Sequence, residues 1–376
     1  MSNRIHFEYD ELAKIESIIE NKKCCFIVGR NSFTKSGFEV FLKNSRINNY
    51  IIYSDFSINP KFDEILNAVK VVKGFDPEII VGIGGGSVLD TAKLVSIFAT
   101  FPKDKIIEKY IIGDEIILER NIELCLIPTT AGSGSEATHF AVVYIGNMKY
   151  SVSSKYLLPD YVILDPYLTE SLPTKQSFIS AFDAFSQAVE SIWSIHSTEE
   201  SRDFAFKALE LLNQNLDKLM LSPNIETRKN LLIASNLAGK AINITKTTGP
   251  HALSYFLTIN FGIPHGLAVF ILLRQFIYYN SPENLSRLKP EISKSDYINR
   301  YNLILAAVNV GNVDELSQRI LHLFEVSKLP ISFNEIIKYS KLEIDMIANS
   351  VNLQRLENNP MALNKKDILD ILNNIV

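Results

Sequence analysis

Short apolar runs that alternate with helical patterns are the strongest constraint on how this chain can fold. Strands joined by crossover helices pair in parallel, so the alternation predicts an α/β domain built on a parallel sheet. Two later runs, at residues 141–144 and 161–164, have the same β-rich character, and we expect them to pair as a hairpin. The four clearest buried strands are expected at residues 24–28, 50–53, 78–83 and 123–127.

After residue 165 the strand pattern fades and long helical patterns take over, for example at residues 175–195 and 200–221. The change of pattern predicts two domains. Residues 1–165 form the α/β domain and residues 166–376 form an all-α domain. Since no linker or low-complexity stretch separates them, we expect the two to pack across a cleft.

Composition excludes several classes of function. Hydrophobic residues make up 47% of the 376 residues, which is typical of a soluble enzyme, and the net charge of -4 predicts no nucleic-acid partner. No apolar run approaches the ~18 residues that a membrane span needs, and the first ten residues lack the apolar core of a secretory signal. The three cysteines lie in apolar runs, as expected for reduced thiols in a cytoplasmic protein.

A glycine-rich turn follows the strand predicted at residues 78–83. Four of the 16 glycines fall within residues 82–86, and a helical run follows them. Backbone N–H groups in such a turn, together with the positive end of the helix dipole, suit a dinucleotide pyrophosphate. The turn could also be a tight connection with no ligand, and it lacks the GxGxxG spacing. The candidate cofactor-binding residues are Gly85, Gly86, Ser87 and Asp90.

A second loop, residues 128–136, also follows a strand and is rich in small hydroxyl residues. Loops at the carboxyl ends of parallel strands line the ligand crevice of an α/β sheet, so we add Thr129, Thr130 and Ser133 to the cofactor site. After the first strand the chain has Arg30 but no acid in residues 29–32. Because a nearby Arg accepts the 2′-phosphate of NADP, we expect NADPH to be used at least as well as NADH.

Asp183 and Gln187 are four residues apart in a helical pattern and therefore share one face. His251 and His265 follow, fourteen residues apart. One carboxylate and two imidazoles suit a divalent metal, and Gln187 offers a neutral oxygen. Spacing alone is not specific, because Asp and His residues are more often surface residues or helix caps.

Four motifs in this order resemble the iron-containing, or group III, alcohol dehydrogenase family: residues 84–90, 128–136, 182–190 and 251–266. The resemblance covers nearly the whole chain. It implies a dehydroquinate synthase-like fold, with an N-terminal dinucleotide-binding domain at residues 1–165 and a helical metal- and substrate-binding domain at residues 166–376. It also implies NAD(P)H and a divalent metal, Fe²⁺ or Zn²⁺, held by one Asp and three His. We further expect a homodimer.

The chain departs from the family pattern at two positions. Gln187 stands where the family has its second metal ligand, a histidine, which predicts weaker or altered metal affinity. Tyr255 stands where the family has a further histidine. Its hydroxyl can still pass a proton, although a phenol is a poor base near neutrality.

These departures narrow the resemblance. Residues 183–187 and 237–255 resemble the hydroxyethylphosphonate dehydrogenases, also called phosphonoacetaldehyde reductases. Lys246, with threonines around it, would then hold the substrate anion, although a solvated lysine is the plain alternative. The expected reaction is reduction of phosphonoacetaldehyde to 2-hydroxyethylphosphonate, a step of phosphonate biosynthesis. Other readings are a dehydrogenase for a neutral short-chain alcohol, a dehydroquinate-synthase-like lyase and a metal-free nucleotide-binding relative without redox activity.

Overall fold

The computed structural model describes residues 6–9, 12–146, 148–221, 223–336, 341–349, 351 and 356–375. The chain divides between Leu172 and Pro173 into two compact units. We call them the α/β unit and the helical unit.

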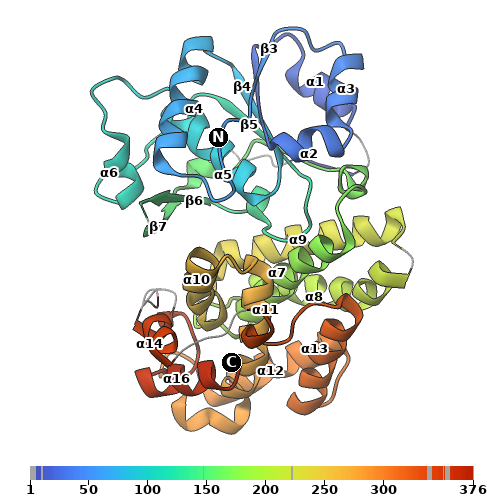
Figure 1. Cartoon of the computed structure of the whole chain (residues 1–376), viewed down its shortest axis with the longest axis vertical. Coiled ribbons are helices and arrows are strands. Elements are labelled where there is room, and N and C mark those ends of the chain that lie inside the picture. Colours follow the sequence, from blue (N-terminus) through green and yellow to red (C-terminus); the bar gives the residue numbers. More distant parts are fainter. Residues whose placement is uncertain are drawn as a thin grey trace. The chain divides into compact units, whose positions relative to one another are not determined.

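A parallel sheet forms the centre of the α/β unit (Figure 1). Its strand order is β1-β8-β5-β4-β2-β3, and each neighbouring pair of strands is parallel. The four apolar runs predicted as strands become β2 to β5, which confirms the expected fold class. The strands of the sheet are β1 (His6–Tyr9), β2 (Cys24–Val28), β3 (Tyr50–Tyr53), β4 (Ile79–Gly84), β5 (Glu123–Pro128) and β8 (Tyr161–Leu164).

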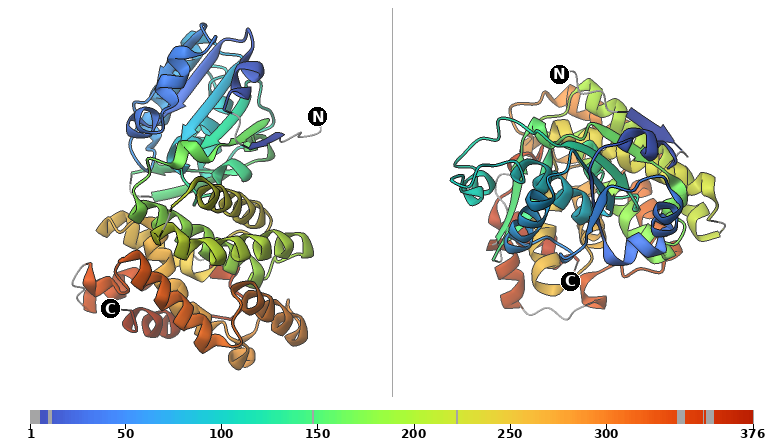
Figure 2. Two further views of the ribbon diagram at one scale, coloured as in Figure 1. Left: turned by 90° about the vertical axis from the view of Figure 1, so that its right-hand side faces the viewer. Right: turned by 90° about the horizontal axis from the view of Figure 1, so that it is seen from above.

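Helices cover both faces of this sheet. Because side chains alternate along a strand, Phe26 packs on one face with residues of α1 and α3, whereas Ile27 packs on the other with residues of α4 and α5. Figure 2 shows helices on either side of the strands. The helices of this unit are α1 (Lys14–Ile19), α2 (Arg30–Lys35), α3 (Phe38–Asn44), α4 (Phe62–Phe75), α5 (Gly86–Phe98) and α6 (Ile107–Ile112), with 3₁₀ turns η1 (Ser135–Ala137), η2 (Lys155–Leu157) and η3 (Pro166–Thr169).

The hairpin predicted between residues 141–144 and 161–164 is wrong. β6 (Phe140–Ile145) pairs antiparallel with β7 (Met148–Ser153), whereas β8 lies in the main sheet between β1 and β5. β7 was not predicted because it has one buried residue and alternates apolar with polar side chains, so it lacks the continuous apolar run that marked the other strands. β8 is a continuous, largely buried apolar run, which is the pattern of a strand covered on both faces of a parallel sheet.

The helical unit is built around α7 (Thr174–Trp193), which is buried without interruption from Ala181 to Trp193. Phe182 and Phe270 stack with ring centroids 3.9 Å apart, and Phe324 packs against both. No described helix is long and apolar enough to cross a membrane. The other described elements are α8 (Glu199–Leu221), α9 (Ile225–Thr245), α10 (Gly249–Phe261), α11 (His265–Tyr279), η4 (Pro282–Arg287), α12 (Lys294–Val308), α13 (Val313–Ser327), η5 (Phe333–Glu335), α14 (Lys341–Asn349) and α16 (Lys365–Asn373).

Candidate active site

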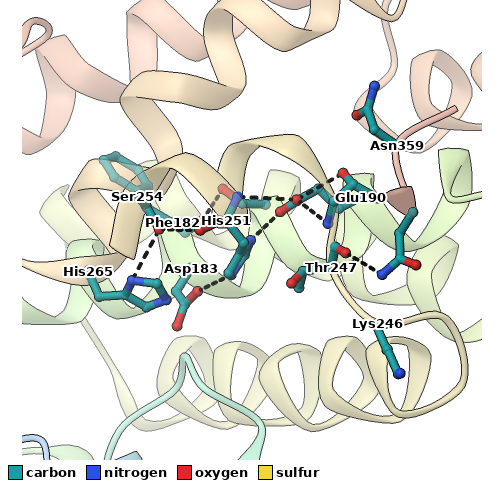
Figure 3. A network of polar contacts seen from close by, with 12 residues as sticks. Phe182, Asp183, Glu190, Lys246, Thr247, His251, Ser254, His265 and Asn359 are labelled. Atoms are coloured by element: carbon teal, nitrogen blue, oxygen red, sulfur yellow. Dashed lines mark hydrogen bonds and ion pairs between the residues drawn. The ribbon is translucent and has the colours of Figure 1, made fainter. Parts of the chain in front are cut away.

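Three helices of the helical unit bring a carboxylate and two imidazoles together (Figure 3). Asp183 lies in the middle of α7, His251 in the first turn of α10 and His265 at the start of α11. One ligand atom from each lies within 4.8 Å of the others, and Asp183 Oδ1 is 3.2 Å from His251 Nε2. Asp183 and His251 are buried and His265 is half-buried. The three residues that the sequence singled out as its strongest metal ligands are therefore neighbours.

Gly266 explains how His265 comes so close to Asp183. A Cβ built on Gly266 would lie 2.0 Å from the backbone oxygen of Ile179 and 3.1 Å from the Cβ of Asp183. The backbones of α11 and α7 are in contact at this point, and only glycine leaves room for that contact. The glycine after His265 thus sets the spacing between two candidate ligands.

Glu190 is the functional residue that the sequence reasoning missed. It is fully buried and lies on α7 one further helical turn beyond Gln187. Its Oε2 contacts Nδ1 of His251, and its Oε1 accepts hydrogen bonds from the backbone N–H and the hydroxyl of Thr248, at 2.8 and 2.9 Å. Its position three residues after Gln187, on the same helical face, was the available signal. A carboxylate behind a ligating histidine fixes the ring orientation and its tautomer.

The pKa of His251 reflects these two carboxylates. Burial by itself would lower that pKa, but the charge of Glu190 and the hydrogen bonds to Asp183 and Glu190 raise it to about 10. The two carboxylates therefore favour the protonated form of His251. A metal ion bound at Nε2 would replace the proton on that atom.

The two positions that depart from the family pattern lie beside this cluster. Gln187 is buried on α7, one turn after Asp183. Tyr255 is half-buried on α10, and its ring stacks on that of His265 with centroids 5.7 Å apart and an interplanar angle of 13°. The phenol therefore lies next to a candidate metal ligand, as its predicted role in proton transfer requires.

Lys246 follows the last residue of α9 and has a backbone conformation that favours glycine, with φ 58° and ψ -178°. Its side chain is exposed, whereas Thr245, Thr247 and Thr248 around it are buried. In Figure 3 Lys246 lies beyond Thr247, at the opposite end of the network from His265. Lys246 and the carboxylate of Asp183 extend toward the same side of that view.

In the α/β unit, the two predicted cofactor loops are in contact. A Cβ on Gly86 would lie 2.9 Å from Ser133 Oγ, and a Cβ on Gly85 would lie 3.5 Å from the side chain of Thr130. The backbone N–H of Thr129 donates to the oxygen of Gly84 at 2.9 Å, which joins the ends of β4 and β5. The start of α5 thus opens onto a surface made of backbone and small side chains, which suits a pyrophosphate.

Asp90 holds the second loop rather than an open ligand surface. Its two carboxylate oxygens accept hydrogen bonds from the Ser135 hydroxyl at 2.6 Å and the backbone N–H of Val142 at 2.9 Å. Burial raises the pKa of Asp90, and the nearby Lys93 opposes that shift. Ser87 accepts a hydrogen bond from the backbone N–H of Asn59 at 3.2 Å. Any effect of Asp90 on a nucleotide would therefore act through the loop that it supports.

Lys93 is a second residue that sequence reasoning overlooked. It lies on α5, is fully buried, and its ammonium donates to the backbone oxygens of Ser135, Thr138 and Phe140 and to the Thr138 hydroxyl. Burial lowers the pKa of Lys93 to about 8, against the charges of Asp90 and Glu136. The available signal was a lysine in α5 among mainly apolar and small side chains, three residues after Asp90. Its acceptors all lie at the end of the serine-rich loop, so it fixes where that loop runs.

Arg30 has an acidic partner that the sequence analysis did not consider. Its guanidinium contacts Asp55 Oδ1 at 2.6 Å, and its Nε donates to the oxygen of Ser54 at 3.2 Å. Both charged side chains are exposed. Asp55 follows β3, and therefore lies outside residues 29–32, which follow β2 and contain no acid. Because β2 and β3 are neighbouring parallel strands, their carboxyl ends bring the two charges together.

Both sites fit the groups that the sequence implied. One carboxylate oxygen and two ring nitrogens within 4.8 Å of one another suit a divalent ion such as Fe²⁺ or Zn²⁺. Gly84 and Gly86 leave no room for a Cβ, so the turn approaches its neighbours with backbone alone, which suits a phosphate bound by backbone N–H groups.

Comparison with known proteins supports the same assignment over both units. A family model described as iron-containing alcohol dehydrogenase matches residues 2–166, and one described as the C-terminal part of the Fe-containing alcohol dehydrogenase family matches residues 177–376. A sulfoacetaldehyde reductase of Bilophila wadsworthia is 28% identical over 327 residues, covering 85% of this chain and 82% of the relative.

Two further relatives span almost the whole chain. An NADPH-dependent butanol dehydrogenase of Clostridium saccharobutylicum is 26% identical over 377 residues, with 98% of this chain and 95% of the relative covered. The crystal structure of sulfoacetaldehyde reductase from Bifidobacterium kashiwanohense in complex with NAD⁺ has a TM-score of 0.87 at 24% identity. That match covers 99% of this chain and 96% of the other, and it shows a shared fold.

Proposed function

The chain belongs to the iron-containing alcohol dehydrogenase family, and we propose that it reduces a small anionic aldehyde, phosphonoacetaldehyde, to its alcohol. As a member of this family the protein is an NAD(P)-dependent alcohol dehydrogenase or aldehyde reductase, and its cofactors are NAD(P) and a divalent metal. The lyase and the metal-free, non-redox relative are therefore set aside. The identity of the substrate, the residues that bind it and the homodimer are the parts that we propose.

In the proposed mechanism, Asp183, His251 and His265 hold the metal, with Gln187 as a fourth or water-linked neighbour. When bound, the metal polarises the carbonyl oxygen of the substrate and the reduced nicotinamide supplies the hydride. Tyr255, stacked on His265, passes a proton toward the alcohol oxygen. Its hydroxyl can both donate and accept, so it links that oxygen to water without needing to act as a strong base.

The proposal of an anionic substrate rests on the position and backbone conformation of Lys246. A non-glycine residue in its backbone conformation costs on the order of 1–3 kcal/mol, and such strain gathers at functional sites. The side chain is exposed, carries a positive charge and belongs to a turn that is bonded to Glu190 beside His251. Its four-carbon stem gives the ammonium reach beyond the turn, and in the proposal it meets an anion on the carbon next to the carbonyl. The sulfoacetaldehyde reductase relative supports this, since its substrate name describes an aldehyde with such an anion.

Two other substrates follow from the relatives. Sulfoacetaldehyde carries a sulfonate where phosphonoacetaldehyde carries a phosphonate, and Lys246 would contact either group. A neutral short-chain aldehyde is the substrate class suggested by the butanol dehydrogenase relative, in which case Lys246 is solvated. The charge of the phosphonate is larger, which favours it in a contact with a cation.

The test compares phosphonoacetaldehyde, sulfoacetaldehyde and butanal in Lys246→Ala, followed by cofactor absorbance with and without added metal. Loss of a charge-assisted hydrogen bond should lower kcat/KM for the anionic substrates by ~10- to 150-fold. Butanal should be affected far less. Lys246→Gly is the matched variant, because glycine suits the backbone of the turn and removes only the side chain.

Two outcomes would contradict the proposal. An equal loss on butanal and on the anionic aldehydes would make Lys246 structural. If the wild-type protein prefers butanal, the phosphonate assignment fails and the enzyme is a dehydrogenase for neutral alcohols. A preference for sulfoacetaldehyde would keep the role of Lys246 and change only the anion.

A further inference from the structure

Glu190 contacts two parts of the helical unit that the proposed function treats separately. It is fully buried on α7, and four groups donate hydrogen bonds to it. Its Oε2 faces Nδ1 of His251. Its Oε1 accepts from the backbone N–H and hydroxyl of Thr248 and, at 3.4 Å, from the backbone N–H of His251.

Only a carboxylate satisfies this arrangement. An ionised carboxylate accepts on both oxygens, whereas an amide must place its NH₂ group against a donor on one of the two sides. The bond to Nδ1 also fixes the tautomer of His251, because it keeps a hydrogen on Nδ1 and leaves Nε2 to face Asp183. The same carboxylate anchors the turn that Lys246 begins, two residues before Thr248.

We propose that Glu190 is a positioning residue that serves two sites at once. With one oxygen it orients His251 for the metal, and with the other it holds the lysine-bearing turn at residues 246–248. This inference rests on the proposed metal and anion sites. It predicts that a metal bound at His251 affects the turn at residues 246–248, and that a change in this turn affects the metal site, in both cases through the side chain of Glu190.

The chain contains a reporter of this network. Trp193 is its one tryptophan, is fully buried, and donates from Nε1 to the Thr248 hydroxyl at 2.9 Å. The Thr248 hydroxyl in turn donates to Glu190, which contacts His251. Tryptophan fluorescence should therefore change when a metal ion alone is added, without substrate, nucleotide or turnover.

The first experiment uses Co²⁺ alone, with binding followed by visible absorption and by Trp193 fluorescence. In Glu190→Gln we expect Co²⁺ affinity to fall by about 10- to 100-fold, the usual effect of losing a partner behind a ligating histidine. Thr248→Val keeps the contact between Glu190 and His251, so its Co²⁺ affinity should stay within about threefold of wild type. Its Co²⁺-induced fluorescence change should disappear, because the hydroxyl that links Trp193 to Glu190 is gone.

The second experiment separates the two roles by kinetics. Thr248→Val should raise KM for phosphonoacetaldehyde by about five- to tenfold with kcat nearly unchanged, since it loosens only the turn. The matched control is Ser186→Ala on α7, the helix of Glu190, whose buried hydroxyl donates to the backbone oxygen of Phe182 at 2.8 Å. It should leave Co²⁺ affinity, the fluorescence response and KM near wild-type values.

Several results would overturn this inference. If the wild type binds Co²⁺ and Glu190→Gln binds it equally well, Glu190 has no role in the metal site, while the proposed function stands. A wild-type protein that binds no Co²⁺ defeats the proposed metal site and this inference with it. Should Glu190→Gln fail to fold, as judged by circular dichroism, Thr248→Val decides: an unchanged fluorescence response and unchanged KM would refute the link.

Discussion

The nucleotide loops of the α/β unit and the metal cluster of the helical unit are built in opposite ways. The loops expose backbone, and each is a single stretch of sequence, at residues 84–90 and 128–136. The metal cluster consists of side chains from α7, α10 and α11, and Asp183 lies 68 residues before His251. Yet each is held in place by a fully buried charged residue next to it, Lys93 for the loops and Glu190 for the metal cluster. A loop that binds through its backbone has carbonyl groups that need a buried donor, and Lys93 supplies it. A cluster of metal-binding side chains has a histidine N–H that needs a buried acceptor, and Glu190 supplies it.

The largest effect should come from removing a ligand of the metal cluster. In His265→Ala we expect both bound metal and turnover to be lost, with kcat/KM falling by about 10³-fold, because the metal contributes several kcal/mol of charge stabilisation. Metal content by elemental analysis and steady-state kinetics measure the two effects. His265→Gln retains bulk against Tyr255 and controls for lost packing. Full activity in a demonstrably metal-free wild-type preparation would refute the metal site.

The corresponding change in the α/β unit is Lys93→Met, which keeps the length of the side chain and removes its ammonium. Three backbone oxygens and one hydroxyl would lose their buried donor. We expect the free energy of unfolding of this unit to fall by about 3 kcal/mol and NADH affinity to drop. Denaturant unfolding and NADH fluorescence titration measure these effects. Co²⁺ binding at the metal cluster is the internal control, and a variant with wild-type stability and NADH affinity would show that Lys93 does not position the loop.

A smaller change should strengthen the metal cluster. Gln187→His restores the ligand that the family pattern has at this buried position, so metal affinity should rise by about tenfold, or 1.4 kcal/mol. Gln187→Leu is the matched variant, because it has similar size and no donor atom. Competition with a chelator measures the order of affinities. If Gln187→His and Gln187→Leu bind metal equally, this position lies outside the coordination sphere.

The smallest effect concerns the exposed pair Arg30 and Asp55. In Asp55→Asn the guanidinium of Arg30 loses its acidic partner and becomes available to the 2′-phosphate of NADPH. The kcat/KM for NADPH relative to that for NADH should then rise about threefold, because an exposed ion pair contributes little free energy. Arg30→Ala should move the ratio of kcat/KM values in the opposite direction. The original expectation that NADPH is used at least as well as NADH stays a prediction, now weakened by the carboxylate of Asp55. An unchanged ratio in both variants would place the pair outside the cofactor site.

The sequence by itself determined the features that depend on neighbours along the chain. Alternating apolar runs identified β2 to β5, clustered glycines identified the turn before α5, and the four-residue spacing identified a helical face carrying Asp183 and Gln187. These signals are local, because strand alternation and helical periodicity repeat over two to four residues. Ordered motifs then indicated the family, whose metal set supported the role already considered for His251 and His265.

Tertiary structure decided everything that joins distant segments. The pairing of β6 with β7 depends on a strand without a continuous apolar run, and the Arg30–Asp55 pair depends on two parallel strands being neighbours. Lys93 and Glu190 look like ordinary helix residues until folding buries them and places acceptors or donors around them. A buried charge must be satisfied by groups brought from elsewhere in the chain, and the sequence pattern around it does not say which groups those are.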